Sequence, residues 1–155
     1  MKRKYLLLLV IFCMLISGCS NSNKTKDVKT SGEFNTVALN NNFTVYDNIS
    51  NYENTDYILE AKIAKINEND AIEMVIYKDV ESAKKVQEKQ VEQFSVRKNT
   101  GASIDKDKGS NYYKYVMISN NMYMVSSRID NTLVFCMTSL NNKDSFSKFI
   151  DQLGY

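Results

Sequence analysis

The sequence predicts an α+β fold in which helices cover one face of an antiparallel sheet of about five strands, as a two-layer sandwich. Two short apolar runs around a polar connector indicate a β-hairpin, and three closely spaced runs near the end of the chain indicate a three-stranded meander. Stretches with helical spacing precede, separate and follow these runs. Segregated strands and helices of this kind are typical of a sheet that is covered by helices.

The hairpin is predicted over residues 57–66 and 71–77, joined by the polar connector 67–70. In its second strand Ile72, Met74 and Ile76 alternate with Glu73, Val75 and Tyr77. Side chains alternate between the two faces of a strand, so the aliphatic set is expected on the core side.

The meander is predicted over residues 112–118, 122–129 and 132–139. The pairs Asn120-Asn121 and Asp130-Asn131 separate the strands, and Asn and Asp are the non-glycine residues that best tolerate the positive φ of two-residue turns. In the third strand, Leu133, Phe135 and Met137 are expected to face the core.

Three helices complete the domain. Ser31 is predicted to cap a short helix over 33–41, and residues 43–46 then look extended. An amphipathic helix over 79–97 has a charged side that is expected to be solvated surface. The last helix begins near Asn142, and Gly154 supplies its left-handed C′ residue. Residues 47–56 and 98–110 read as loops.

The amino terminus has the layout of a secretory signal. Met1 is followed by three basic residues, then by an apolar run to Ile16, then by Ser17, Gly18 and Cys19. The apolar run has about 12 residues, whereas a membrane-spanning helix needs about 20. A retained transmembrane anchor is therefore not expected.

The residues Ile16-Ser17-Gly18-Cys19 resemble the lipobox of bacterial prolipoproteins, which usually has leucine where Ile16 stands. The resemblance implies cleavage between Gly18 and Cys19 and a diacylglyceryl group, with palmitate-like chains, on the Cys19 thiol. Two acyl chains hold a protein on a bilayer almost irreversibly. The alternative is an ordinary cleaved signal with an incidental cysteine.

Three segments are expected: a signal peptide over residues 1–18, a flexible tether over 19–32 and a single α+β domain over 33–155. The tether is polar, and a flexible chain of this length spans about 20 Å. Removal of the signal takes three of the 20 basic residues, which leaves 17 against 18 acidic ones. Both signs are interspersed, so no nucleic-acid partner is expected.

The composition argues against an enzyme. The chain has no His, which removes the usual general base near neutral pH and the commonest transition-metal ligand. Cys136 lies in an apolar strand pattern and reads as a buried hydrophobe rather than a reactive thiol. Asp105, Asp107 and Gly109 only faintly resemble a calcium loop, because no Glu closes it and Lys residues intervene. No metal or cofactor is predicted.

Four tyrosines cluster in the meander: Tyr112, Tyr113, Tyr115 and Tyr123. Tyrosine supplies rigid amphipathic contact area in binding sites. It is also a good strand former, so the sequence leaves open whether these side chains form a binding face or pack within the sheet.

The run 123–135, the ending Leu-Gly-Tyr155 and the segment that begins at Phe43 resemble small Gram-positive lipoproteins without an assigned activity. The resemblance implies a fold and a location at the cell membrane, which we call the address. The leading hypothesis is a binding module, anchored through Cys19 on the extracytoplasmic face of a Gram-positive cell membrane. It would contact an envelope protein or wall polymer through an uncovered sheet face or its Asn-rich loops. The alternatives are an immunity or inhibitor lipoprotein that blocks a toxin or hydrolase, and an enzyme without His.

Overall fold

The computed structural model of the protein describes residues 24–53 and 55–155. Its helices are α2 (Ser31–Asn40), α3 (Val80–Val96) and α4 (Lys143–Leu153), with 3-10 turns at Ile49–Asn51 and Leu140–Asn142. Its strands are β1 (Thr44–Asp47), β2 (Ile58–Lys65), β3 (Ala71–Tyr77), β4 (Ser103–Lys108), β5 (Tyr112–Ser119), β6 (Met122–Ile129) and β7 (Thr132–Ser139). The predicted α+β class and antiparallel sheet are confirmed.

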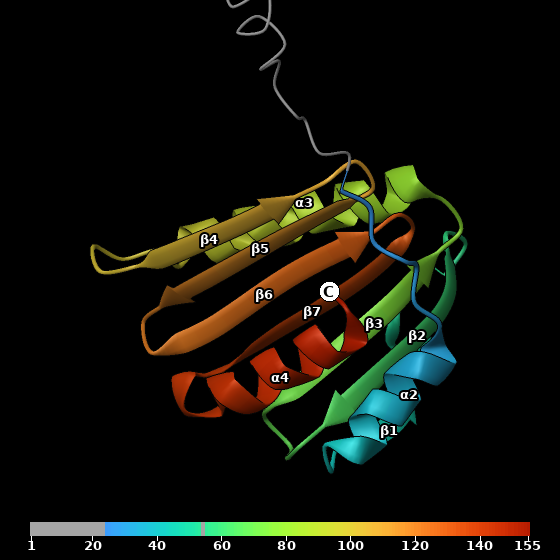
Figure 1. Ribbon diagram of the computed structural model, residues 1–155, viewed down its shortest axis with the longest axis horizontal. Coiled ribbons are helices and arrows are strands. Elements are labelled where there is room, and N and C mark those ends of the chain that lie inside the picture. Colours follow the sequence, from blue (N-terminus) through green and yellow to red (C-terminus); the bar gives the residue numbers. More distant parts are fainter. Residues whose placement is uncertain (1–23, 54) are drawn as a thin grey trace, which may run out of the picture.

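The sheet is larger than predicted, with seven strands in the order β1-β2-β3-β7-β6-β5-β4 (Figure 1). The predicted hairpin is β2–β3 and the predicted meander is β5–β6–β7. The two further strands, β1 and β4, lie at the edges. Residues 43–46 were expected to be extended but were not counted in the sheet, and β4 falls in a segment that was expected to be a loop. Both lack a buried apolar face, because β1 is mostly exposed and β4 is exposed throughout.

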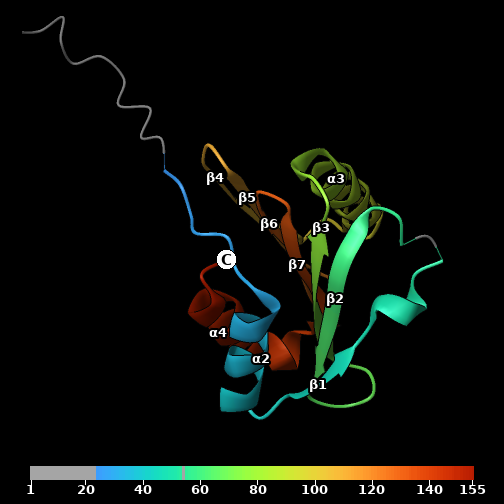
Figure 2. The ribbon, with the colours of Figure 1, turned by 90° about the vertical axis from the view of Figure 1, so that its right-hand side faces the viewer.

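The prediction that the helices cover one face is wrong. Figure 2 shows α2 and α4 on one side of the sheet and α3 on the other, so the molecule has three layers. Phe34 of α2 and Phe149 of α4 share a core with one face of the sheet, whereas Ala83 and Phe94 of α3 pack on the opposite face. The cause lies in the central strands, because β3 and β6 bury side chains of both faces. A sheet of this kind needs cover on both sides.

Turn chemistry places the meander and the end of α4 as predicted, whereas the N-cap of α2 is Thr30 and not Ser31. Asn120, Asn121 and Asp130 all adopt positive φ at the meander turns, and Gly154 ends α4 with φ of 92°. Tyr155 then folds back into the core and is 2% exposed. Asp79 caps α3 by accepting a hydrogen bond from the Ser82 amide at 2.7 Å.

The boundary between tether and domain lies earlier than predicted. Residues 24–29, here called the strap, lie against the domain, and α2 starts at Ser31 with Thr30 as its N-cap in a capping box with Glu33. Asn111 holds the strap from both sides: its Oδ1 accepts from the Lys26 amide at 3.0 Å and its Nδ2 donates to the Lys26 carbonyl at 2.8 Å. The polar composition predicted a flexible chain over these residues. It gave no sign of the contact because Asn111 lies 85 residues away from Lys26 along the chain.

Candidate functional site

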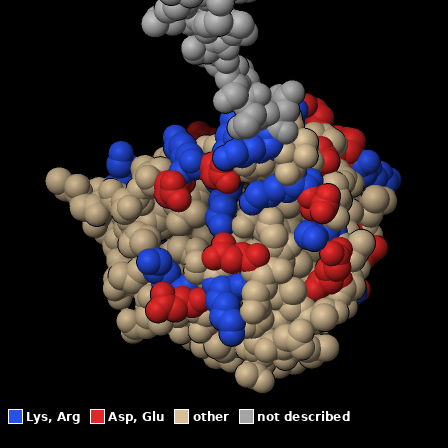
Figure 3. All heavy atoms as spheres, in the orientation of Figure 1, with Lys and Arg blue, Asp and Glu red and all other residues tan. Residues whose placement is uncertain are grey.

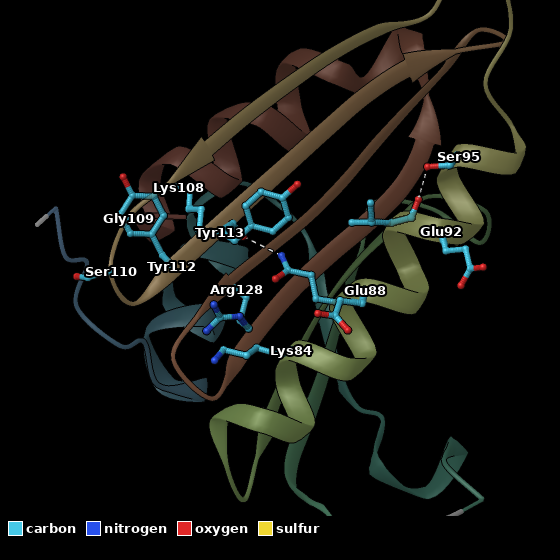
Figure 4. Close-up of a pocket in the computed structure, with 12 residues that line it drawn as sticks. Lys84, Glu88, Glu92, Ser95, Lys108, Gly109, Ser110, Tyr112, Tyr113 and Arg128 are labelled. Carbon is cyan, nitrogen blue, oxygen red and sulfur yellow. Dashed lines mark hydrogen bonds between the residues drawn. The ribbon is translucent and has the colours of Figure 1, made fainter. Parts of the chain in front are cut away.

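A groove lies between α3 and the paired ends of β4, β5 and β6 (Figure 4). We call it the α3 groove; its volume is about 670 Å³. Charged, polar and aromatic side chains line it, and the argument below uses Lys84, Gln87 and Glu88 of α3 with Lys108, Tyr113 and Arg128 of the sheet. A volume in this range is typical of small-molecule sites.

Strand register builds the floor of the groove. Lys108 pairs with Tyr113 across β4 and β5, and Tyr113 pairs with Arg128 across β5 and β6. Directly opposed residues in antiparallel strands project to the same face with Cβ atoms about 5 Å apart. The three side chains therefore stand in one row on the face that α3 covers.

Arg128 is the buried cation of this row. Its residue is 6% exposed, and its Nη1 donates to the carbonyl oxygens of Asp130 at 2.9 Å and Asn111 at 3.4 Å. Its Nε has no hydrogen-bond partner and is shielded from solvent. Burial lowers the pKa of Arg128, and the nearby Asp130 partly opposes that effect. Because an arginine stays protonated in proteins, the site holds a positive charge, and no carboxylate of the described residues forms an ion pair with it.

Helix α3 is fixed over the groove by a buried amide. Gln87 is 3% exposed, and its Nε2 donates to the Tyr113 carbonyl at 2.8 Å and the Ser126 carbonyl at 3.2 Å. One turn further along, Gln90 Oε1 accepts from the Ser126 hydroxyl at 2.7 Å. These hydrogen bonds tie α3 to β5 and β6 by polar contacts, so the helix lies at a fixed height above the row.

The charged side of α3 was expected to be plain solvated surface. Lys84, Glu88 and Glu92 are indeed exposed, but they also border the α3 groove. In the described part of the chain neither Lys84 nor Lys108 forms an ion pair. Their charges therefore remain available to a ligand.

The strap is attached at one end of the groove. Gly109 and Ser110 line the groove, and Ser110 also donates from its amide to the Lys24 carbonyl at 3.0 Å. A Cβ at Gly109 would lie 2.2 Å from that same carbonyl oxygen and 2.2 Å from Tyr112 Cε1. Only glycine fits between the strap and the ring. Lys26 completes the contact with its Nζ 4.8 Å from the centroid of the Tyr112 ring.

The sequence left open whether the four tyrosines form a binding face or pack within the sheet, and the structure packs three of them within the protein. Tyr112, Tyr115 and Tyr123 are each 3% exposed. Tyr112 and Tyr123 belong to the core under α2 and α4, whereas Tyr113 and Tyr115 pack on the α3 side. Strand alternation separates Tyr112 from Tyr113, and both sheet faces are covered. Tyr112 and Tyr113 both border the α3 groove, and Tyr113 is the one member of the four that is partly exposed.

The remaining predicted residues are placed as follows. Gly18 and Cys19 lie outside the described residues. Cys136 is buried as expected, and burial raises the pKa of its thiol to about 12. In the segment that faintly resembles a calcium loop, β4 sends Lys106 and Lys108 to the α3 side and Asp107 to the other, where it accepts from the Tyr112 hydroxyl at 3.1 Å.

The described residues offer neither a cluster of metal-binding side chains nor a membrane-spanning helix. They contain no group of three or more Cys, Asp or Glu side chains placed to hold a metal ion. Within the same residues, no helix is both long enough and apolar enough to cross a bilayer.

Arg128 and Gln87 were not singled out from the sequence. One signal was present for Arg128, because it is the only charged residue within the segments that form β6 and β7. A lone charged side chain in an otherwise uncharged strand costs free energy when it is buried, unless a hydrogen-bond or ion-pair partner compensates it. Gln87 lies on the apolar side of its helix between Ala83 and Val91, which is a similar but weaker signal.

A second buried polar cluster lies elsewhere on the α3 side. Glu73 of β3 is 9% exposed and accepts from the Tyr52 hydroxyl at 2.8 Å and from the Asn48 side-chain amide at 2.5 Å. Burial raises the pKa of Glu73, and these two hydrogen bonds partly oppose the rise. Both hydrogen bonds tie the Ile49–Asn51 turn to the sheet, so the cluster has a structural role.

Comparison with known proteins adds one likeness in fold. No protein-family model matches the chain, and the search among curated proteins found no match. Among solved structures, a GTP binding regulator from Thermotoga maritima is similar, with a TM-score of 0.46 and 16% sequence identity. The match covers 84% of this chain and 89% of that one. At this level of similarity the match carries no inference about this chain.

Proposed function

We propose that this protein is a lipoprotein of the extracytoplasmic face of the cell membrane and acts there as a binding module, with the α3 groove as its ligand site. The basic start, the apolar run and the residues Ile16-Ser17-Gly18-Cys19 support the address. The absence of His from the whole sequence favours binding over catalysis.

The strap makes the proposed attachment short. The described chain contacts the domain from Lys24 onward, so five Cα steps separate it from Cys19. A fully extended chain spans at most about 3.6 Å per step, which is about 18 Å in total. A lipid on Cys19 would therefore keep the strap end of the domain close to the headgroups, and the α3 groove opens beside that end.

One observation carries the binding role: Arg128 is buried in the wall of a groove of ligand size, and it forms no ion pair with any of the described residues. A buried charge without an ion-pair partner lowers the stability of a fold. Such a cost is typical of binding and active sites. Charges of both signs are mixed on the α2 and α4 face (Figure 3).

The address is tested by replacing the cysteine. Wild type and Cys19→Ala are expressed in a Gram-positive host and separated into membrane and soluble fractions, and the wild type is analysed by intact mass. We expect a diacylglyceryl mass increment on a chain that starts at Cys19, and loss of that increment with release or precursor accumulation in the variant. Cys13→Ala is the matched control, because it removes a cysteine of the signal and should leave the anchor unchanged.

An unmodified Cys19 in the wild type, or a Cys19→Ala protein that is processed and retained as firmly as the wild type, would reject the address. Protease treatment of whole cells tests the side of the membrane, because an extracytoplasmic domain is degraded while cytoplasmic markers survive. Co-purification of a toxin or hydrolase would identify the binding role as a protective one.

A further inference from the structure

We propose that the α3 groove binds a small ligand through an oxyanion, a phosphate or carboxylate group, that sits on Arg128 between Lys84 and Lys108, with hydroxyl or amino groups of the ligand facing Glu88. This rests on the proposed role as a binding module and names the class of ligand. Four features of the groove support it: the unpaired Nε of Arg128, the unpaired lysines, the position of the acidic residues and the size of the cavity.

The guanidinium of Arg128 has one hydrogen-bonded nitrogen, Nη1, and an unpaired Nε that is shielded from solvent. Nη1 donates to two backbone carbonyls, which fixes the side chain. The Nε and Nη2 edge is the one that binds carboxylates and phosphates through two parallel hydrogen bonds. Lys84 lies beside Arg128 in Figure 4, and its long flexible side chain can move aside as an anion enters.

Lys84 and Lys108 add positive charge on two sides of Arg128. Lys84 comes from α3, and Lys108 stands in the row Lys108–Tyr113–Arg128 on the sheet. Within the described chain none of these three cations forms an ion pair with Glu88 or Glu92. Cations that converge in a partly enclosed groove raise the local concentration of anions.

The acidic residues restrict the rest of the ligand. Glu88 and Glu92 lie further along α3 than Lys84, so the groove is positive at one end and negative along the other part of the helix. A purely anionic ligand would be repelled there. A ligand with an oxyanion at one end and hydrogen-bond donors at the other fits both parts, and glycerol 3-phosphate is a simple probe with these groups.

The test uses the full-length protein purified in detergent and in buffer with little chloride. Isothermal titration calorimetry measures binding of glycerol 3-phosphate, inorganic phosphate and acetate. We expect saturable binding of at least one of them with one site per chain. Arg128→Gln should weaken it about tenfold or more, because a hydrogen-bonded charge pair is lost. Arg97→Gln is the matched control, since Arg97 is an exposed arginine at the far end of α3 and does not line the groove.

A second variant keeps the test decisive if Arg128→Gln does not fold. Lys84 and Lys108 are exposed, so the double variant Lys84→Gln with Lys108→Gln should fold normally and weaken binding severalfold. Glu88→Gln should leave phosphate binding intact or strengthen it, and should weaken the added contribution of the glycerol hydroxyls. Absence of saturable binding by the wild type, or equal binding by wild type and the double lysine variant, would overturn the proposal.

The phosphate could belong to a lipid headgroup or to a free compound. Wild-type protein in nanodiscs of phosphatidylcholine is compared with protein in nanodiscs that contain phosphatidylglycerol. If the headgroup occupies the groove, the second lipid lowers the apparent affinity for glycerol 3-phosphate, and Arg128→Gln removes the difference. If the ligand is a free compound, both nanodiscs give the same affinity.

Failure of this inference is separable from failure of the proposed address. The groove lies wholly within the described domain, so a Cys19→Ala protein in detergent should bind the probes as tightly as the wild type. Retained binding with no lipid on Cys19 would reject the address alone. A lipidated protein without oxyanion binding would reject the site alone.

Discussion

Replacement of Asn111 by alanine should release the strap without unfolding the domain. Asn111 makes three side-chain hydrogen bonds, to the amide of Lys26 at 3.0 Å, to its carbonyl at 2.8 Å and to Asp130 Oδ2 at 3.0 Å. The first two fasten the strap. A net value of about 1 kcal/mol for each hydrogen bond gives about 2 kcal/mol for the attachment at this point.

A loss of this size raises the population of the open strap about 30-fold, because about 1.4 kcal/mol corresponds to a factor of ten. The assay is native-state hydrogen exchange of full-length protein in detergent, read at the Ser110 amide, which donates to the Lys24 carbonyl of the strap. We expect exchange there to accelerate about 30-fold in Asn111→Ala, while amides of β6 and β7 keep their protection. The matched control is Asn69→Ala, an exposed turn residue far from the strap along the chain.

Two results would refute this reasoning. Unchanged exchange at Ser110 would mean that other contacts, such as the Lys26 side chain over the Tyr112 ring, hold the strap alone. A uniform acceleration over the whole domain would mean that Asn111 supports the fold and not the strap. If Cys19 carries lipid, release up to Thr30 lengthens the free connection from five to eleven Cα steps, from about 18 Å to about 40 Å at full extension.

Three further predictions concern the core. Phe149→Ala should lower the free energy of unfolding by about 3–5 kcal/mol in denaturant titration, because the ring is fully buried and makes edge contacts with Phe34 and Phe43; a loss below 1 kcal/mol would contradict this packing. Burial raises the pKa of Glu73, so the folded state holds this proton more tightly than the unfolded state, and the stability it contributes is lost as the pH rises above the usual carboxyl range. Wild type should therefore lose stability relative to Glu73→Gln between about pH 4 and pH 8, and parallel profiles would reject the assignment. The Cys136 thiol, with its pKa raised to about 12, should resist Ellman's reagent at pH 8 until guanidinium unfolds the chain, whereas rapid labelling of the folded protein would show that the side chain is accessible.

Local chemistry made most elements predictable. The meander followed from Asn120, Asn121 and Asp130, whose side chains tolerate the left-handed backbone that the turns adopt. The last helix followed from its apolar spacing and from Gly154, which has the expected positive φ. In both cases a few neighbouring residues decide the conformation.

The edge strands show where such reasoning stops. β4 has the sequence Ser-Ile-Asp-Lys-Asp-Lys, and all six of its residues are exposed, so no apolar alternation marks it. It is a strand because it pairs with β5, from Ser103 opposite Ile118 to Lys108 opposite Tyr113. Charged edge strands of this type also discourage pairing with other chains.

The α3 groove could not be predicted from the sequence either, because it also depends on contacts between distant segments. Arg128 could be noticed as a lone charge in an apolar region, but its neighbours Lys84 and Lys108 are 44 and 20 positions away. Sheet register and the side on which α3 packs bring them together. Contacts between distant segments determine the register and the side on which α3 packs. The local sequence pattern indicates neither of them.

The amino-acid sequence by itself determined the secondary structure that depends on near neighbours: the hairpin, the meander with its Asn and Asp turns, the three helices with Gly154 at the end of the last one, and the burial of Cys136. Tertiary structure decided what depends on contacts between distant segments. These are the two edge strands, the placement of α3 opposite α2 and α4, the attachment of the strap at Asn111 and the convergence of cations on Arg128. The physical reason is the range of the interactions, because backbone propensity and capping act within a few residues, whereas strand pairing and packing join side chains that are far apart along the chain.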